Sequence, residues 1–354
     1  MTNMKISFTV IIAVILLQSC KKNNEVINIP PDVSGIYVAG SMKNAASITY
    51  ACYWKNGTKT DLTNPSAGSG TDAAAYDMNF LGNDLYIAGF YKQATGNYRA
   101  VYWKNGSINY LTDGAYNADA RVVKINAPDV YMLVNEQNAA GLSIIKYWKN
   151  GTLTAVTDGS SSCVASDMAV SGTDIYVLGY QKVGNDKVHK LWKNGVSTII
   201  STGGVPLQSV YFHLEVVGND VYIAGSDWDG TGFTKAVLYK NGNRTMLTDG
   251  VSNHAYAWGG ITVNGTDVFA TGNEYNASFF SIATYWKNGI KTTLGNGMAN
   301  SQAEDVFIHG ADTYILGYES SVTSVGTVLY WKNGLATRLT DGVLSAKGYS
   351  ILVK

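Results

Sequence analysis

The sequence is poor in proline, charge and cysteine, and these shortages exclude several classes of protein. Only 5 Pro accompany 38 Gly among the 354 residues, and only 3 Cys are present. Such a composition is neither collagen-like nor that of a disulfide-rich scaffold. Hydrophobic residues make up 46% of the chain, too many for a disordered protein. Charged residues make up 15%, against about 25% on average. The chain is therefore globular, with an unusually uncharged surface.

An excess of positive charge is also missing. Lys plus Arg and Asp plus Glu number 26 each. A protein without net charge creates no global field that would concentrate nucleic acid or an anionic membrane around it. We therefore expect no nucleic-acid partner.

Long apolar runs are missing except near the N-terminus. Residues 6–17 form a 12-residue apolar run after a basic start, which is too short for a membrane-spanning helix and typical of a signal peptide. The run ends in Leu-Gln-Ser-Cys at residues 17–20, which resembles the lipobox of bacterial lipoproteins. That resemblance implies that Cys20 is lipidated after signal removal. The alternative is an ordinary signal peptide with Cys20 there by chance.

These observations predict three segments. Residues 1–19 are the signal peptide, and residues 20–34 comprise the lipidated Cys20 and a polar tether with a Pro pair. Residues 35–354 form the folded domain. Several acyl chains on one cysteine give stable anchoring, so we expect contact with the membrane through this lipid only. The expected location is the cell envelope, at the outer membrane, on its periplasmic or surface side.

A pentapeptide of the form Tyr-Trp-Lys-Asn-Gly recurs through the folded domain. Its Trp position falls at Trp54, Trp103, Trp148, Trp192, Tyr239, Trp286 and Trp331. The repeats therefore average about 46 residues. A second motif, close to Ile-Tyr-Val-Ala-Gly, also occurs seven times in the same phase, first at residues 36–40. Two motifs in one phase establish a sevenfold repeat.

Each repeat has the pattern of four short strands. Gly-x-Asp forms a tight turn between the first two strands, and Asn-Gly supplies the positive φ angles of a type I′ hairpin between the last two. Seven such units predict an all-β, seven-bladed β-propeller of four antiparallel strands per blade. The chain enters at a second-strand motif, and residues 346–353 have a first-strand pattern. We therefore expect the C-terminal strand to complete the N-terminal blade and close the ring.

The repeat is similar in length and strand count to known propeller repeats. Together with the lipobox, the chain resembles a Bacteroidota-type surface or periplasmic lipoprotein built from Trp-Lys-Asn-Gly repeats. It differs from WD repeats, because Gly-His and Trp-Asp are missing, and from kelch repeats, because regular Gly-Gly pairs are missing. The resemblance therefore implies a fold and a location in the cell envelope but no activity.

The loops between second and third strands differ in every repeat, whereas the tight turns are nearly uniform. In a propeller these two kinds of connection lie on opposite faces, so we call the first the variable face and the second the turn face. Binding residues commonly sit on loops held by a rigid scaffold. The variable face is the predicted contact surface, unless its loops merely tolerate change. The loops are residues 41–50, 91–97, 135–141, 181–187, 226–234, 273–278 and 319–326.

Polar side chains are predicted to converge at the mouth of the central channel on the variable face. Alignment on the turn Asp gives one equivalent position in each blade, with Trp258 and Glu304 nearby. Such a set could bind a cation, or a sugar stacked on Trp258. The alternative is that the Asp side chains bond only to loop backbone. The aligned residues are Asp77, Val122, Asp167, His213, Gly260, Asp305 and Gly348.

The repeated Trp has two interpretations as well. Exposed indoles could stack on sugars, but the same placement in six of seven repeats favours packing between blades. Cys52 and Cys163 are expected on opposite sides of the ring, too far apart for a disulfide.

No known catalytic motif occurs, and no residue is assigned a catalytic or metal-ligating role. The expected function is a non-enzymatic binding or scaffold module for a protein or glycan partner, monomeric and without a cofactor. The alternative is an envelope glycan lyase or hydrolase using Asp77, Asp167, Asp305 and His213. A purely structural role in an envelope complex is a third possibility.

Overall fold

The computed structural model describes residues 33–354, except 65, 67–69, 201–212, 229–231, 249–253 and 321–325. The predicted signal peptide, Cys20 and nearly all of the predicted tether lie outside these residues. All regular secondary structure in the described part of the chain is β-strand. No helix within these ranges is long and apolar enough to cross a membrane.

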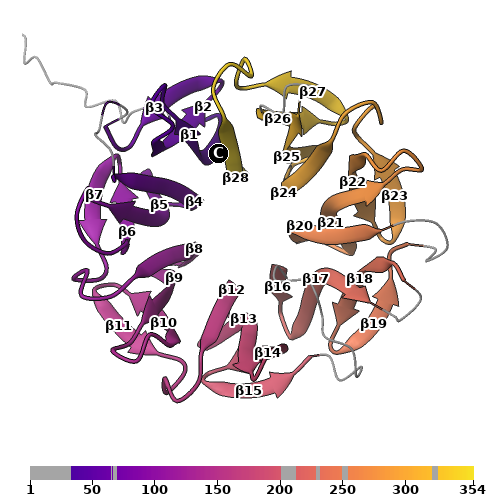
Figure 1. Ribbon diagram of the computed structural model, residues 1–354. Coiled ribbons are helices and arrows are strands. Elements are labelled where there is room, and N and C mark those ends of the chain that lie inside the picture. The colour runs from indigo at the N-terminus through magenta and orange to yellow at the C-terminus, as the bar shows by residue number, and fades with distance from the viewer. Residues whose placement is uncertain are drawn as a thin grey trace, which may run out of the picture. The chain divides into compact units, whose positions relative to one another are not determined.

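The strands form seven antiparallel sheets of four strands each, arranged in a ring (Figure 1). The predicted seven-bladed β-propeller is confirmed. From the channel outward, blade 1 contains β28 (Ala346–Val353), β1 (Ile36–Lys43), β2 (Thr49–Lys55) and β3 (Thr58–Asp61). Blade 2 contains β4 (Asp72–Leu81), β5 (Asp84–Lys92), β6 (Arg99–Lys104) and β7 (Ser107–Tyr110). Blade 3 contains β8 (Ala118–Asn126), β9 (Asp129–Gln137), β10 (Ser143–Lys149) and β11 (Thr152–Ala155). Blade 4 contains β12 (Cys163–Ser171), β13 (Asp174–Val183), β14 (Asp186–Lys193) and β15 (Val196–Ile199). Blade 5 contains β16 (His213–Val217), β17 (Asp220–Trp228), β18 (Thr234–Lys240) and β19 (Asn243–Met246). Blade 6 contains β20 (Ala255–Asn264), β21 (Asp267–Tyr275), β22 (Ser281–Lys287) and β23 (Ile290–Thr293). Blade 7 contains β24 (Ser301–His309), β25 (Asp312–Ser320), β26 (Gly326–Lys332) and β27 (Leu335–Arg338).

The C-terminal strand closes the ring as predicted. In Figure 1, β28 in yellow lies beside β1 in indigo. The two strands pair antiparallel from Ile36 with Val353 to Met42 with Ala346. Gly35 and Lys354 also exchange two backbone hydrogen bonds, which extend the ladder by one residue pair. The two ends of the folded domain therefore belong to one sheet.

The two repeated motifs join to form a latch on the turn face. In blade 2, Lys104 Nζ lies 2.8 Å from the Asp84 carboxylate and over the ring of Tyr86. Asn105 donates to the same carboxylate through its amide and accepts from the backbone N–H of Leu85. The same Asp–Lys–Asn arrangement recurs in blades 3 to 7. The Asn and Gly of each hairpin have positive φ, as a type I′ turn requires.

The repeated Trp packs between blades, and the predicted structural role is confirmed. Trp103 of blade 2 is fully buried in a cluster that includes Tyr37, Ala39 and Ala51 of blade 1. Trp54 of blade 1 packs in the same way against blade 7. Equivalent clusters join each remaining pair of successive blades. Truncation of a core Trp typically costs about 3–5 kcal/mol, so these contacts dominate the cohesion of the ring.

The glycine of the second-strand motif makes room for this indole. A Cβ on Gly89 would lie 2.9 Å from the Trp103 ring and 2.0 Å from the carbonyl oxygen of Ala74. Gly40 has the same relation to Trp54 in blade 1. The two sequence motifs are therefore linked by steric fit as well as by the latch.

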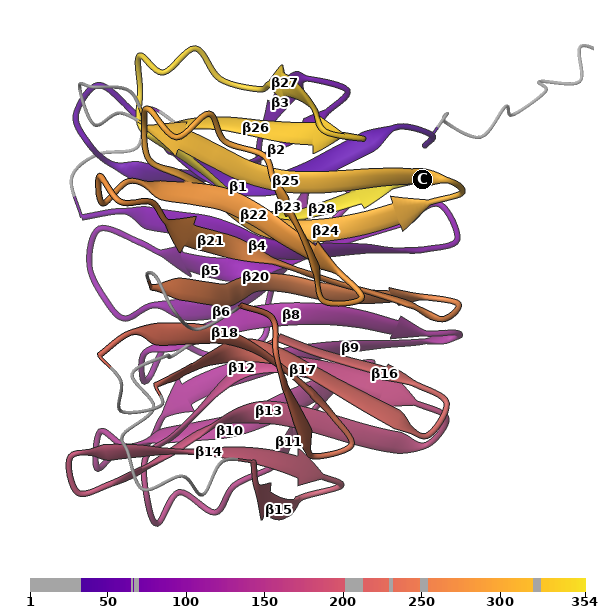
Figure 2. The ribbon, with the colours of Figure 1, turned by 90° about the vertical axis from the view of Figure 1, so that its right-hand side faces the viewer.

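The two faces of the ring are built as predicted, with shorter loops. Figure 2 shows the ring from the side, with the short turns on the right and the longer connections on the left. Several strands extend into the residues predicted as loops. Between β13 and β14, for example, only residues 184–185 form the connection. Cys52 and Cys163 are both free and buried, in blades 1 and 4. Cys163 is the first residue of β12.

Closure can be tested at Ile351, which is 2% exposed in the cluster joining blades 7 and 1. Ile351→Ala should lower the free energy of unfolding by about 2–5 kcal/mol, because it leaves a cavity in that seam. Ile290→Ala is the matched control: Ile290 is 73% exposed on β23, and its loss should change stability by less than about 0.5 kcal/mol. Urea unfolding measures both, and equal effects would contradict the closure.

Candidate binding site in the central channel

A cavity of about 620 Å³ occupies the central channel. All six residues predicted from the sequence line it, namely Asp77, Asp167, His213, Trp258, Glu304 and Asp305. Gln302 and Lys347 also line it, and they are the second residues of β24 and β28. Because these strands start at the variable face, the cavity lies in that half of the channel. The predicted convergence is therefore present.

The predicted residues lie deeper than expected. Asp77 is the sixth of ten residues of β4, and Asp305 is the fifth of nine in β24. They therefore line the middle of the channel rather than its mouth. A β-bulge precedes each of them, because Ala75 and Asp77 pair with consecutive residues of β5. The bulge leaves Tyr76 unpaired, and bulges commonly redirect a side chain in this way.

The alignment is wrong at one blade. Ser350, not Gly348, occupies the position in blade 1 that corresponds to Asp77, because Ser350 pairs with Ala39 as Asp77 pairs with Ala88. Blade 1 has no turn Asp to anchor the alignment, so the offset could not be read from the motif. The Ser350 hydroxyl donates to Asp77 Oδ1 over 2.8 Å.

The three channel aspartates bridge successive blades. Asp77 Oδ2 accepts from the backbone N–H of Val123 in the next blade, and Oδ1 accepts from the N–H of Met78. Asp167 accepts in the same way from Leu214 and Met168, and Asp305 from Ile351 and Val306, all at 2.7–2.8 Å. The backbone-bonding alternative is therefore the observed role, with the partner N–H groups in strands rather than in loops.

The three carboxyl groups differ in their electrostatic surroundings. Burial raises the pKa of Asp305 to about 7, helped by the charge of Asp77, although two backbone N–H groups act in the opposite direction. Burial likewise raises the pKa of Asp77 above its usual value. The pKa of Asp167 lies below its usual range, because Lys124 and His213 together outweigh the effect of burial. Lys124 Nζ and His213 Nδ1 lie 4.0 Å and 3.5 Å from this carboxylate.

Asp167 also affects its two neighbours. Burial alone would lower the pKa of His213, but Asp167 and Asp305 raise it above its usual value. The pKa of Lys124 is raised by Asp167, Asp77 and Glu215 despite burial. Lys124 therefore remains charged in the channel and balances part of its acidic wall.

Further aromatic rings pack beside the Trp258 ring in the cavity wall. Trp258 stacks on Tyr256, with ring centroids 4.3 Å apart and planes 17° apart, and Tyr256 also stacks with His254, with centroids 6.2 Å apart. Burial raises the pKa of Glu304, whose Oε1 lies 3.9 Å from Lys347 Nζ. Glu304 is the residue that the bulge leaves unpaired in β24, and Trp258 lies within the irregular stretch between Tyr256 and Gly260 in β20.

Several residues of the site were missed by the sequence argument. Tyr76, Arg121 and Tyr349 are the residues that the bulges leave unpaired in blades 2, 3 and 1, and all three line the cavity with Lys124. A signal was present for Tyr76 and Arg121, since each precedes its aligned position by one residue, whereas Tyr349 follows Gly348, the residue aligned in blade 1. Alternation along a regular strand would have pointed them away from the channel.

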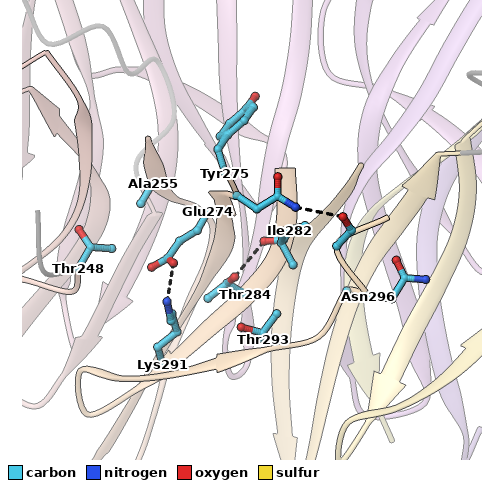
Figure 3. Close-up of a pocket in the computed structure, with 12 residues that line it drawn as sticks. Thr248, Ala255, Glu274, Tyr275, Ile282, Thr284, Lys291, Thr293 and Asn296 are labelled. Carbon is cyan, nitrogen blue, oxygen red and sulfur yellow. Dashed lines mark hydrogen bonds and ion pairs between the residues drawn. The ribbon is translucent and has the colours of Figure 1, made fainter. Parts of the chain in front are cut away.

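A second cavity of about 360 Å³ lies near the variable face beside blade 6 (Figure 3). Its charged groups are paired, because Lys291 Nζ donates to Glu274 over 2.7 Å. Asn276 donates to the carbonyl oxygen of Gly297, and the Thr284 hydroxyl donates to that of Ile282. The Asn276 bond joins two loops, the Lys291 pair joins β23 to β21, and the Thr284 bond lies within β22. Across the described ranges, no three His, Cys, Asp or Glu side chains cluster so as to hold a metal ion.

Comparisons with protein families and with curated proteins found no match. Among solved structures, the chain is similar to a puromycin-hydrolysing peptidase of Mycobacterium tuberculosis, with 10% identity and a TM-score of 0.56 over 88% of this chain. It spans about half, 51%, of that peptidase. It is also similar to TolB from Acinetobacter baumannii, with 10% identity and a TM-score of 0.41, covering 92% of this chain and 69% of TolB. The peptidase likeness shows the fold alone.

The raised pKa of Asp305 predicts a pH dependence of stability. The folded state holds this proton up to a pH of about 7, whereas the unfolded chain releases it near 3.8. The contribution of Asp305 is therefore fully present below about pH 4 and is lost as the pH rises to about 7, a change on the order of 1–4 kcal/mol. Urea unfolding of wild type and Asp305→Asn from pH 4 to 8 measures it. A wild-type advantage that grows with pH would contradict the assignment.

Proposed function

We propose that the protein is a lipid-anchored, non-enzymatic binding module that presents its variable face and channel cavity to a glycan or protein partner in the cell envelope. The observation that supports this most directly is the cavity of about 620 Å³, which contains aromatic rings beside polar groups. Concave sites of about 300–1,000 Å³ with this mixture are typical of ligand-binding sites. An aromatic ring such as Trp258 suits a ligand with apolar faces and polar edges.

The alternative of a glycan-cleaving enzyme has less support than a binding module. A glycan hydrolase needs one carboxyl group as an acid and another as a base or nucleophile. Both oxygens of Asp77, Asp167 and Asp305 accept hydrogen bonds from backbone N–H groups of two blades. Such groups are held as bridges between blades rather than directed at a substrate. The geometry therefore favours binding over catalysis.

The proposed anchor would orient the ring. The chain enters the propeller at Gly35, which bonds to Lys354 on the turn face. A tether from Cys20 therefore joins the face with the uniform turns and paired charges. The variable face and the upper cavity lie on the opposite side of the ring, which suits capture of a partner outside the membrane.

The cavity proposal predicts a ligand effect that depends on Trp258. A ligand at 100 times its dissociation constant adds about 2.7 kcal/mol to the free energy of unfolding, so melting temperature rises. We expect such a rise for wild type with at least one envelope glycan, and its loss in Trp258→Ala, each relative to the ligand-free protein. Thermal unfolding against a glycan panel measures this. Turnover of the glycan that is abolished by Asp167→Asn would instead support the enzyme.

The anchor proposal predicts the behaviour of Cys20→Ala. Wild type should incorporate labelled palmitate and partition into the detergent phase, because acyl chains on Cys20 hold it in the membrane. Cys20→Ala should do neither, while Cys52→Ala and Cys163→Ala, which replace buried thiols in the folded ring, should keep the label. Equal labelling of Cys20→Ala and wild type would contradict lipidation at this residue.

A further inference from the structure

A side groove of about 380 Å³ lies beside the central cavity, between blades 2 and 3. Asp72, Ala118 and Ser143 line it, and they are the first residues of β4, β8 and β10. All three strands start at the variable face. The groove therefore opens on the same face as the channel.

The groove and the channel share two wall residues. Tyr76 and Arg121 line both cavities, and they are the bulge residues of neighbouring blades. The Arg121 guanidinium lies 4.6 Å from the centre of the Tyr76 ring. The two cavities therefore adjoin at this pair, and we call them together the cleft.

Aromatic rings follow the cleft without interruption. Tyr349 of the channel contacts Tyr76 at a centroid distance of 5.0 Å. Tyr76 contacts Phe90 at 5.6 Å, and Phe90 contacts Tyr98 at 5.1 Å. Phe90 and Tyr98 line the groove. This path of rings favours an extended ligand with a series of apolar faces.

Several charged groups along the cleft are paired within its walls, and the remaining carboxyl groups disfavour an anion. Arg121 pairs with Asp119 at 2.6 Å, and Lys146 pairs with Glu136. Lys347 lies 3.9 Å from Glu304 in the channel. A ligand with net charge would have to break these pairs or leave its own charge without a partner, which is costly away from water. A neutral ligand is therefore favoured.

Polar atoms on the same walls still lack hydrogen bonds. Trp258 Nε1, Glu304 Oε1 and Asp119 Oδ1 have no hydrogen-bond partner in the described part of the chain. The first atom needs an acceptor, and each ionised carboxylate oxygen needs a donor. Hydroxyl groups supply both, and enclosed polar atoms of this kind call for a partner.

We infer that the channel and the side groove together bind a neutral oligosaccharide of several units. One end lies in the channel beside Trp258 and Glu304, and the chain continues past Tyr76 and Arg121 to Tyr98. Pyranose rings supply the apolar faces and the hydroxyl edges that these walls require. This inference rests on the proposed binding function and specifies its ligand and its second subsite.

The test is the dependence of affinity on chain length. Neutral gluco-, manno-, galacto- and xylo-oligosaccharides of two to six units are titrated into the purified protein by calorimetry. For at least one series, the six-unit chain should bind about ten times more tightly than the two-unit chain, since stacking on a further ring adds roughly this factor. Tyr98→Ala should abolish this gain and leave two-unit binding unchanged. Trp258→Phe, which removes the indole N–H, should weaken every length about fivefold to tenfold.

The matched control is Phe279→Ala. Phe279 is 77% exposed in the β21–β22 loop and lies outside both cavities, so its loss should change neither affinity nor length dependence. Binding that needs Trp258 but shows no effect of length or of Tyr98→Ala would overturn the second subsite and leave the proposed function intact. A weak ligand is expected to have a dissociation constant of roughly 1 mM. If no neutral series binds at about ten times this concentration, the proposed ligand class is wrong. Binding unaffected by Trp258→Phe would contradict the channel site itself.

Discussion

The packing of each indole against the preceding blade is the constraint on which the rest of the structure depends. Trp103 fills the seam between blades 1 and 2, and this ring and the Ala74 carbonyl oxygen together leave no room for a side chain at Gly89. The Lys and Asn that follow the Trp then latch the same blade at the turn face. One pentapeptide thus joins neighbouring blades and fastens its own blade. Because it recurs in every blade, similar contacts run around the ring, and the short outermost strands are the sheet edges that remain.

A second set of bonds acts at the channel, where Asp77, Asp167 and Asp305 each hold the backbone of the following blade. Both oxygens of each carboxyl group accept a backbone N–H, and each group directly follows the bulge of its strand. The bulges place Tyr76 and Arg121 in the cavity wall. The structural role of the aspartates and the binding role proposed for the residues one position earlier are therefore separate but coupled through the bulge.

The fold was predictable from the sequence because its signals are local and repeated. Asn-Gly predicts a hairpin, and the number of motif copies gives the number of blades. The second-strand pattern at residues 36–40 has no first strand before it, so the missing strand must come from the other end of the chain. The six candidate residues were also found together, since a tight turn fixes the register of the first two strands. The bulge was not predictable, because it changes no motif. For that reason Tyr76, Arg121 and Tyr349 were missed. Gly348 was chosen in place of Ser350 because blade 1 has no turn Asp to anchor the alignment.

The most direct measurement separates the two roles in one protein. In Asp77→Asn, the free energy of unfolding and the affinity for a six-unit neutral oligosaccharide are measured together. The account predicts a loss of stability of about 1–3 kcal/mol, because one oxygen that accepts N–H bonds is replaced by a donor, with affinity unchanged within about twofold. Unchanged stability with loss of binding would contradict it, and would place the aspartates in the ligand site instead of between the blades.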